Sequence, residues 1–139
     1  MDGEADGFGI RLGQGASLAF GVISGRESMA LTARAQELGF DEVHQGVHDK
    51  LGLVREIIER RGLESADVCF VGDDLIDVQA MRYCGLAVAP ADAMEEVREV
   101  AHHVTQRRGG RGAVREVVDL VLRAGGSWDK VTARYFTER

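Results

Sequence analysis

Short apolar runs alternate with amphipathic stretches along this chain. The runs at 18–23, 41–45, 68–71 and 86–89 predict strands, with a brief edge strand at 102–105. Apolar residues at helical spacing predict helices over 27–38, 50–61, 93–101 and 113–123, a short one near 7–14, and one that begins near residue 75. Strands that alternate with helices indicate βαβ units. We therefore expect an α/β fold with a mostly parallel sheet and helices on both faces.

The chain shows no internal repeat and no linker that would separate two domains. We therefore expect one domain over residues 1–139, with a C-terminal tail over 127–139. That tail carries Trp128, Val131, Tyr135 and Phe136. Exposed aromatic residues often mark an interface, so the tail could pack on a neighbouring subunit. Folding back on its own core is the simpler default.

Composition narrows the class of protein. Apolar residues make up 45% of the 139 positions and charged residues 29%, which is typical of a soluble globular protein. The net charge of −6 argues against nucleic acid or an acidic membrane surface as a partner. No apolar run approaches the length of a membrane span. Two cysteines, Cys69 and Cys84, without a secretory leader suggest reduced thiols and a cytoplasmic location.

Three carboxylates follow the run at 68–71, which we expect to be a strand buried on both faces. Gly72 ends that strand, and Asp73, Asp74 and Asp77 lie on the turn and first helical turn that follow. Acidic groups this close repel one another, and a hard divalent cation relieves the repulsion through oxygen ligands. The alternative is capping of the next helix, which explains one or two of the three carboxylates. A metal-linked site is the preferred interpretation.

Two further strand ends carry candidate chemistry. Ser24 and Gly25 follow the run at 18–23 and precede a helix, where a hydroxyl and free backbone N–H groups suit a phosphate. Taken alone, Ser24 would more simply be a helix cap. Lys50 lies at a helix start, where the helix dipole disfavours a cation. It would neutralise a substrate phosphate or a catalytic carboxylate, although a solvated lysine is about as common.

A basic, glycine-rich hinge precedes the last clear helix. Its Arg107, Arg108 and Arg111 could reach a phosphate or a sugar acid from a mobile loop, and a solvated basic turn is an equal alternative. The four histidines do not have zinc-like spacing, because His102 and His103 would point to opposite faces of a strand and the other two lack partners. We assign no zinc site.

In this order along the chain, Ser24, Lys50 and the run Gly72-Asp73-Asp74-x-x-Asp77 resemble motifs two to four of the haloacid dehalogenase superfamily. The similarity is closer to one of its families, the 3-deoxy-D-manno-octulosonate 8-phosphate phosphatases, and extends from about residue 6 to 126. The segments that carry it are 6–11, 23–26, 45–46 together with 49–50, 71–77 and 108–116.

This resemblance implies a Rossmann-like, three-layer α/β/α domain without a cap, and magnesium-dependent hydrolysis of a sugar-acid phosphate through an aspartyl-phosphate. Ser24 and Lys50 would hold the transferring phosphoryl group, which agrees with a reaction that depends mainly on positioning and charge neutralisation. The resemblance also implies a homotetramer whose subunits complete one another's active sites. It assigns Mg²⁺ to Asp73, Asp74 and Asp77, and substrate binding to Gly25, Arg26 and Arg111.

The family's first motif, an Asp-x-Asp-Gly at the end of a central strand, is not in this sequence. That motif supplies the nucleophile and the acid/base. Asp2-Gly3-Glu4 imitates its spacing, but no apolar strand precedes it. In this superfamily the first strand lies between the strands that end at Ser24 and Gly72. Without it, those two strands must pair directly, recruit a strand from another subunit, or leave unpaired edges.

Two functions therefore remain. One is a phosphatase whose natural chain is longer than this sequence, with weak or no turnover expected from the 139 residues by themselves. The other is a shortened, non-catalytic relative that binds magnesium or phosphate and acts through assembly with partners.

Overall fold

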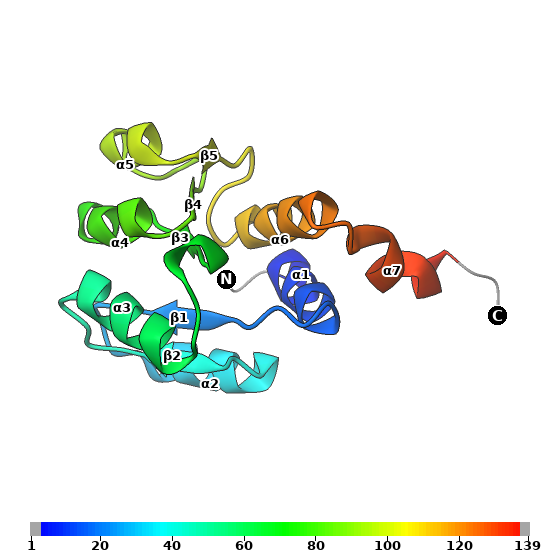
Figure 1. Ribbon diagram of the computed structural model, residues 1–139, viewed down its shortest axis with the longest axis horizontal. Coiled ribbons are helices and arrows are strands. Elements are labelled where there is room, and N and C mark those ends of the chain that lie inside the picture. Colours follow the sequence, from blue (N-terminus) through cyan, green and yellow to red (C-terminus); the bar gives the residue numbers. More distant parts are fainter. Residues whose placement is uncertain (1–3, 137–139) are drawn as a thin grey trace.

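The computed structural model describes residues 4–136 (Figure 1). The helices and strands run in the order α1 (Glu4–Gly15), β1 (Gly21–Ile23), α2 (Met29–Leu38), β2 (Glu42–His44), α3 (Lys50–Arg60), β3 (Cys69–Val71), α4 (Val78–Tyr83), β4 (Leu86–Ala89), α5 (Glu95–Val100), β5 (His103–Val104), α6 (Ala113–Ala124) and α7 (Trp128–Thr132). Three 3-10 turns complete the set: η1 (Ser65–Asp67), η2 (Leu75–Asp77) and η3 (Ala133–Tyr135). The predicted elements are all present, mostly one to three residues shorter than expected.

The strands form two separate sheets. β1 pairs with β2, and β3, β4 and β5 pair in that order, with every pairing parallel. The predicted α/β fold with parallel strand pairing is confirmed. Within residues 4–136, β1 and β3 do not pair with each other, so direct pairing of these two strands is excluded.

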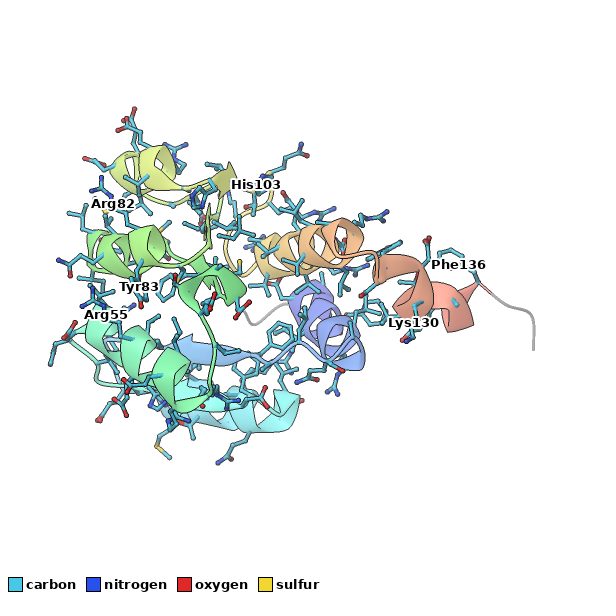
Figure 2. The ribbon with its side chains drawn as sticks, in the orientation of Figure 1. Arg55, Arg82, Tyr83, His103, Lys130 and Phe136 are labelled. Atoms are coloured by element: carbon cyan, nitrogen blue, oxygen red, sulfur yellow. The ribbon has the colours of Figure 1, made fainter. Side chains whose placement is uncertain are left out.

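Helices cover both faces of the strands (Figure 1). Helices α3, α4 and α5 lie in a row on one face, and α1 and α6 pack together on the other. One hydrophobic cluster bridges the two sheets: Val54 and Ile58 of α3 pack with Ala80 and Cys84, and residues of both β1 and β3 lie against them. Arg55 of α3 also lies over the ring of Tyr83 in α4, 5.0 Å from its centre (Figure 2). The sheets are therefore held side by side by their helices rather than by strand pairing.

Local signals explain where the helices begin and end. The Ser28 hydroxyl accepts the Leu31 N–H at the start of α2, and Gly39 ends that helix with a φ of 70°, a value that glycine adopts without strain. Asp49 accepts the Gly52 N–H and caps α3. Ser24 is therefore not the cap of α2, because Ser28 has that role.

The expectation that 68–71 is a strand buried on both faces is wrong. Cys69 and Val71 of β3 are exposed, as is Gly21 of β1, and Val71 keeps 39% of its surface open to solvent. The physical reason is that, among the strands of residues 4–136, β1 and β3 each have a neighbour on one side alone, so the other edge and part of the face meet water. By contrast, Ala87, Val88 and Ala89 of β4 are fully buried, because β4 lies between two strands.

The N-terminal helix is fixed to the body by residues far along the chain. Asp6 is completely buried, and its Oδ1 accepts the backbone N–H of Arg115 in α6 at 3.0 Å. Gly9 lets the two helices approach closely, because a Cβ there would lie 2.9 Å from the Arg115 backbone. The predicted short helix at 7–14 is thus confirmed and begins earlier, at Glu4.

The C-terminal segment is partly helical. Trp128 and Val131 of α7 pack on the cluster built from α1 and α6, as the default of folding back on the core predicts. Phe136 keeps 82% of its surface exposed and lies at the far end of the molecule (Figure 2). No helix in the described part of the chain is long and apolar enough to cross a membrane.

Candidate functional site

The candidate site lies where the segments after three strands meet. Lys50 begins α3 after β2, and Asp77 closes the 3-10 turn after β3. The Lys50 Nζ donates to Asp77 Oδ1 at 2.7 Å, and the two side chains are only 9% and 6% exposed. Gly25, after β1, lies against Ile76, with 3.8 Å between a Cβ built on Gly25 and the Ile76 Cδ1. The ends of β1, β2 and β3 are therefore brought together.

Asp77 organises the acidic turn. Its second oxygen, Oδ2, accepts the backbone N–H groups of Asp73 at 3.0 Å and Asp74 at 3.2 Å. Asp74 in turn caps the 3-10 turn by accepting the Leu75 N–H at 2.7 Å. Capping therefore accounts for Asp74 and Asp77, as the alternative interpretation allowed, and leaves Asp73 to be explained.

Asp73 is exposed at the mouth of this turn. The pKa of its carboxyl is raised above the ordinary value, first because neighbouring protein atoms keep water from part of it, and then because Asp77 and Asp74 lie close. The Lys50 ammonium acts in the opposite direction. Such a crowded carboxylate favours a proton or a cation beside it.

The acidic turn does not by itself present a complete set of metal ligands. Among residues 4–136, no three His, Cys, Asp or Glu side chains are grouped so that they could hold a metal ion. The assignment of a cation to Asp73, Asp74 and Asp77 therefore stays a prediction.

Gly72 makes the tight turn possible. A Cβ at this position would lie 2.6 Å from the Asp77 Cβ and 2.7 Å from the Met81 Sδ. The backbone at residue 72 therefore lies directly against the Asp77 side chain, and only glycine leaves room for it. Its N–H donates to the Val88 carbonyl oxygen at 3.0 Å, which ties the turn to β4.

Ser24 lies close to the site, but its hydroxyl forms hydrogen bonds within the turn that contains Ser24. The Oγ donates to the Arg26 carbonyl oxygen at 3.0 Å and accepts the Arg26 N–H at 3.2 Å. Arg26 itself is exposed. Ser24 is therefore placed at a strand end as predicted, and its phosphate-binding role stays a prediction, as does that of Arg26.

The basic hinge is an ordered loop, which we call the arginine loop (residues 106–111). Two carboxylates fasten it: Glu116 accepts the N–H groups of Gln106 and Arg107, and Asp92 accepts the Gly109 N–H at 2.9 Å. The Gly109 hydrogen bond lowers the pKa of Asp92 below its ordinary value. The sequence interpretation missed Asp92 and Glu116, although a glutamate four residues after a glycine at a helix start was the available signal.

The arginine loop shares the sheet edge with the acidic turn. Both follow strands of the three-stranded sheet, and the segment after β4 lies between them. That segment contacts the acidic turn through Met94, whose N–H donates to the Asp73 carbonyl oxygen at 3.2 Å. It contacts the arginine loop through Ala91, whose N–H donates to the Arg107 carbonyl oxygen at 3.2 Å. Arg111 is exposed on this loop and has no contact with Lys50 or Asp77 among the hydrogen bonds and ion pairs of the described residues.

This fold and this strand-end site define a class of protein. The family model for haloacid dehalogenase-like hydrolases matches residues 25–117, two thirds of the chain, and the chain belongs to that family. Within it, the chain is a member of the group of 3-deoxy-D-manno-octulosonate 8-phosphate phosphatases, on the similarities that follow.

Curated and solved relatives agree on that group. The phosphatase of this name from Yersinia pestis is 43% identical over 119 residues, which are 86% of this chain and 64% of the relative. A probable phosphatase from Pseudomonas syringae superposes with a TM-score of 0.94 at 35% identity, over 97% of this chain and 77% of that one. A 3-deoxy-D-manno-octulosonate 8-phosphate phosphatase from Moraxella catarrhalis was solved with magnesium, phosphate and the sugar acid. It superposes with a TM-score of 0.91 at 34% identity, over 94% of this chain and 75% of that one. The chain spans about two thirds of the length of the curated relatives.

Proposed function

We propose that this chain carries the phosphate-holding part of a magnesium-dependent phosphatase that acts on a sugar-acid phosphate. The single observation that carries the proposal is the buried Lys50–Asp77 pair at the meeting point of three strand ends. Open α/β sheets bind ligands at such strand ends. The buried Lys50 ammonium, held by Asp77 of the acidic turn, places positive charge beside carboxylates at the ends of the strands. Phosphoryl transfer requires such a combination of charges.

Each predicted residue has a role in this proposal. Lys50 neutralises charge on the phosphoryl oxygens, and the Ser24 hydroxyl and the Gly25 N–H donate hydrogen bonds to them. Arg26 and Arg111 bind the anionic sugar acid, because guanidinium groups match carboxylates and phosphates. Family membership and the exposure of both arginines support this assignment.

Asp73 would bind the magnesium ion, and Asp74 and Asp77, whose oxygens hold the turn in shape, would orient the metal shell. Carboxylate oxygens are the ligands that a hard divalent cation prefers. Burial first, and then the nearby Asp77 and Asp74, raise the pKa of Asp73, and a cation beside Asp73 would stabilise its charged form. When bound, magnesium supplies positive charge for the phosphate oxygens. Asp77 meanwhile orients the turn, because its Oδ2 holds the N–H groups of residues 73 and 74.

A nucleophile is needed in addition. No Asp-x-Asp-Gly occurs in the 139 residues, so we propose that turnover depends on a strand carrying it that enters between β1 and β3. The unpaired edges of β1 and β3 support this proposal, since exposed edges bind further strands.

Magnesium binding and phosphate release test the proposal separately. In calorimetry we expect Asp73→Asn to abolish magnesium binding and the exposed Asp129→Asn, on α7, to leave it unchanged. We expect release of phosphate from 3-deoxy-D-manno-octulosonate 8-phosphate only when an apolar strand peptide ending in Asp-x-Asp-Gly is added. Wild-type protein that binds no magnesium, or turnover that survives Asp73→Asn, would contradict the proposal.

A second candidate is a non-catalytic assembly module. Its supporting observation is the exposure of two large apolar residues beside the site, Leu75 at 56% and Ile76 at 58%. The same surface would serve the homotetramer that we propose for the phosphatase. Failure of the peptide to produce turnover, with magnesium binding intact, would favour this candidate. For either function we propose a cytoplasmic location, in keeping with the free thiols of Cys69 and Cys84.

A further inference from the structure

Glu116 lies in the first turn of α6, directly after the arginine loop. Its carboxylate accepts the Gln106 N–H with both oxygens at 3.0 Å, and Oε1 also accepts the Arg107 N–H at 3.1 Å. His103 Nε2 lies 3.6 Å from Oε2. One side chain on α6 therefore holds the two backbone N–H groups at which the loop leaves β5.

The rest of the loop is fastened in the same way, through its backbone. Thr105 is buried, and its hydroxyl donates to the Arg107 carbonyl oxygen and accepts the Ala91 N–H. The Arg108 carbonyl oxygen accepts the N–H groups of Arg111 and Ala113. Gly112, with a φ of 107°, lies so close to the Arg107 side chain that a Cβ would meet its Cδ at 2.7 Å. The loop is thus held in one shape before any ligand arrives.

The guanidinium groups themselves are left available. Arg107, Arg108 and Arg111 are all exposed, and within residues 4–136 none of them forms an ion pair. The nearby carboxylates of Asp92 and Glu116 accept hydrogen bonds from loop amides. The charge of Arg108 also acts on Asp92, but the two side chains form no ion pair among the described residues. Acidic groups that hold backbone while leaving arginines unpaired produce a preorganised anion-binding element.

We propose that Glu116 is a positioning residue that sets the arginine loop for an anionic ligand, the sugar acid of the proposed function, on which this inference rests. It acts through the N–H groups of Gln106 and Arg107 and does not itself touch the ligand. Its negative charge alone would weaken anion binding nearby. The positioning role therefore predicts that removal of the Glu116 charge lowers the affinity for the anionic ligand. A purely electrostatic effect of Glu116 predicts that the same change raises this affinity.

Glu116→Gln decides between them, because glutamine keeps the shape and one acceptor oxygen but loses the charge. With 3-deoxy-D-manno-octulosonate as the calorimetric probe, we expect affinity to fall about tenfold, and further in Glu116→Ala. Amide hydrogen exchange at Gln106 and Arg107 should accelerate in the same order. Asp119→Asn is the matched control, since it removes the same charge one turn further along α6 and Asp119 contacts Arg115 rather than the loop.

Each outcome has a definite meaning. Affinity that rises or stays constant in Glu116→Gln, or exchange at residues 106 and 107 that does not change, overturns the positioning role. Equal losses in Asp119→Asn also overturn it. If the wild-type protein protects these amides and yet binds no sugar acid, the proposed function fails with respect to its substrate class, and with it the role of Glu116 toward that ligand.

Discussion

Lys50 and Asp77 form a buried ion pair that joins the two sheets of this protein. Lys50 belongs to the segment after β2, Asp77 to the segment after β3, and their 2.7 Å contact links them across a point where no strand pairing exists. Asp77 also accepts the N–H groups of residues 73 and 74. The same ion pair therefore stabilises both the contact between the two sheets and the conformation of the acidic turn.

Removal of the lysine charge should therefore cost stability. Lys50→Met leaves Asp77 buried without its cation, and we expect the free energy of unfolding to fall by about 3–5 kcal/mol in urea denaturation. The chain offers a matched control in its only other lysine, the exposed Lys130. Lys130→Met should change stability by less than about 0.5 kcal/mol. A similar loss of unfolding free energy in both variants would show that the Lys50–Asp77 pair does not stabilise the contact between the sheets.

Gly72→Ala should distort the acidic turn. The new Cβ would overlap Asp77 and Met81, so we expect a loss of about 1–3 kcal/mol, measured by thermal or urea unfolding. Gly15→Ala is the control, because a Cβ at Gly15 has no atom within 4 Å and alanine is the better helix former. A neutral Gly72→Ala would mean that the turn relaxes without strain.

Glu42 makes stability depend on pH. Its carboxylate in β2 accepts bonds from Arg60 and Arg61 at the end of α3 and contacts His44 at 2.8 Å. The Arg60 hydrogen bond, followed by those of His44 and Arg61, outweighs burial and lowers the pKa of Glu42 well below its ordinary value.

A carboxyl whose pKa is lower in the folded state stabilises the fold above its unfolded pKa, and loses this contribution as the pH falls toward the folded value. At pH 7, Glu42→Gln should therefore be about 1–3 kcal/mol less stable than wild type. Urea titrations at intervals from pH 7 to 3 should show that difference shrinking below about pH 4.5. A difference that is independent of pH would contradict the role of the Glu42 charge.

The exposed pair Leu75 and Ile76 should control self-association. Replacing Ile76 with Lys adds a charge to an apolar surface beside the site, so the proposed oligomer should weaken in light scattering coupled to gel filtration. Met29→Lys is the control, because it places the same charge on another exposed apolar residue, Met29 of α2, which is 91% exposed. An oligomer that is unaffected by Ile76→Lys would place the interface elsewhere.

The sequence by itself determined what depends on near neighbours in the chain. The helices over Met29–Leu38 and Lys50–Arg60 follow from apolar spacing, and Gly39 and Asp49 are local signals for where they end and begin. The cap at Ser28 was not predicted, because Ser24 was the candidate. The motif Gly72-Asp73-Asp74-x-x-Asp77 was recognisable because a tight acidic turn is a local feature. These signals were sufficient for the fold class and the family.

Only the tertiary structure decided which distant groups meet. Lys50 and Asp77 are 27 positions apart and Asp6 and Arg115 are 109 apart, so no local pattern predicts that they touch. The sequence left unpaired edges at β1 and β3 as one of three alternatives, and the tertiary structure decided between them. The contact of Glu116 with the arginine loop was not predicted by any sequence pattern. The physical reason is that periodicity reports how one segment buries its own apolar face, whereas edge pairing, ion pairs and loop clamps depend on which segments the whole chain brings into contact.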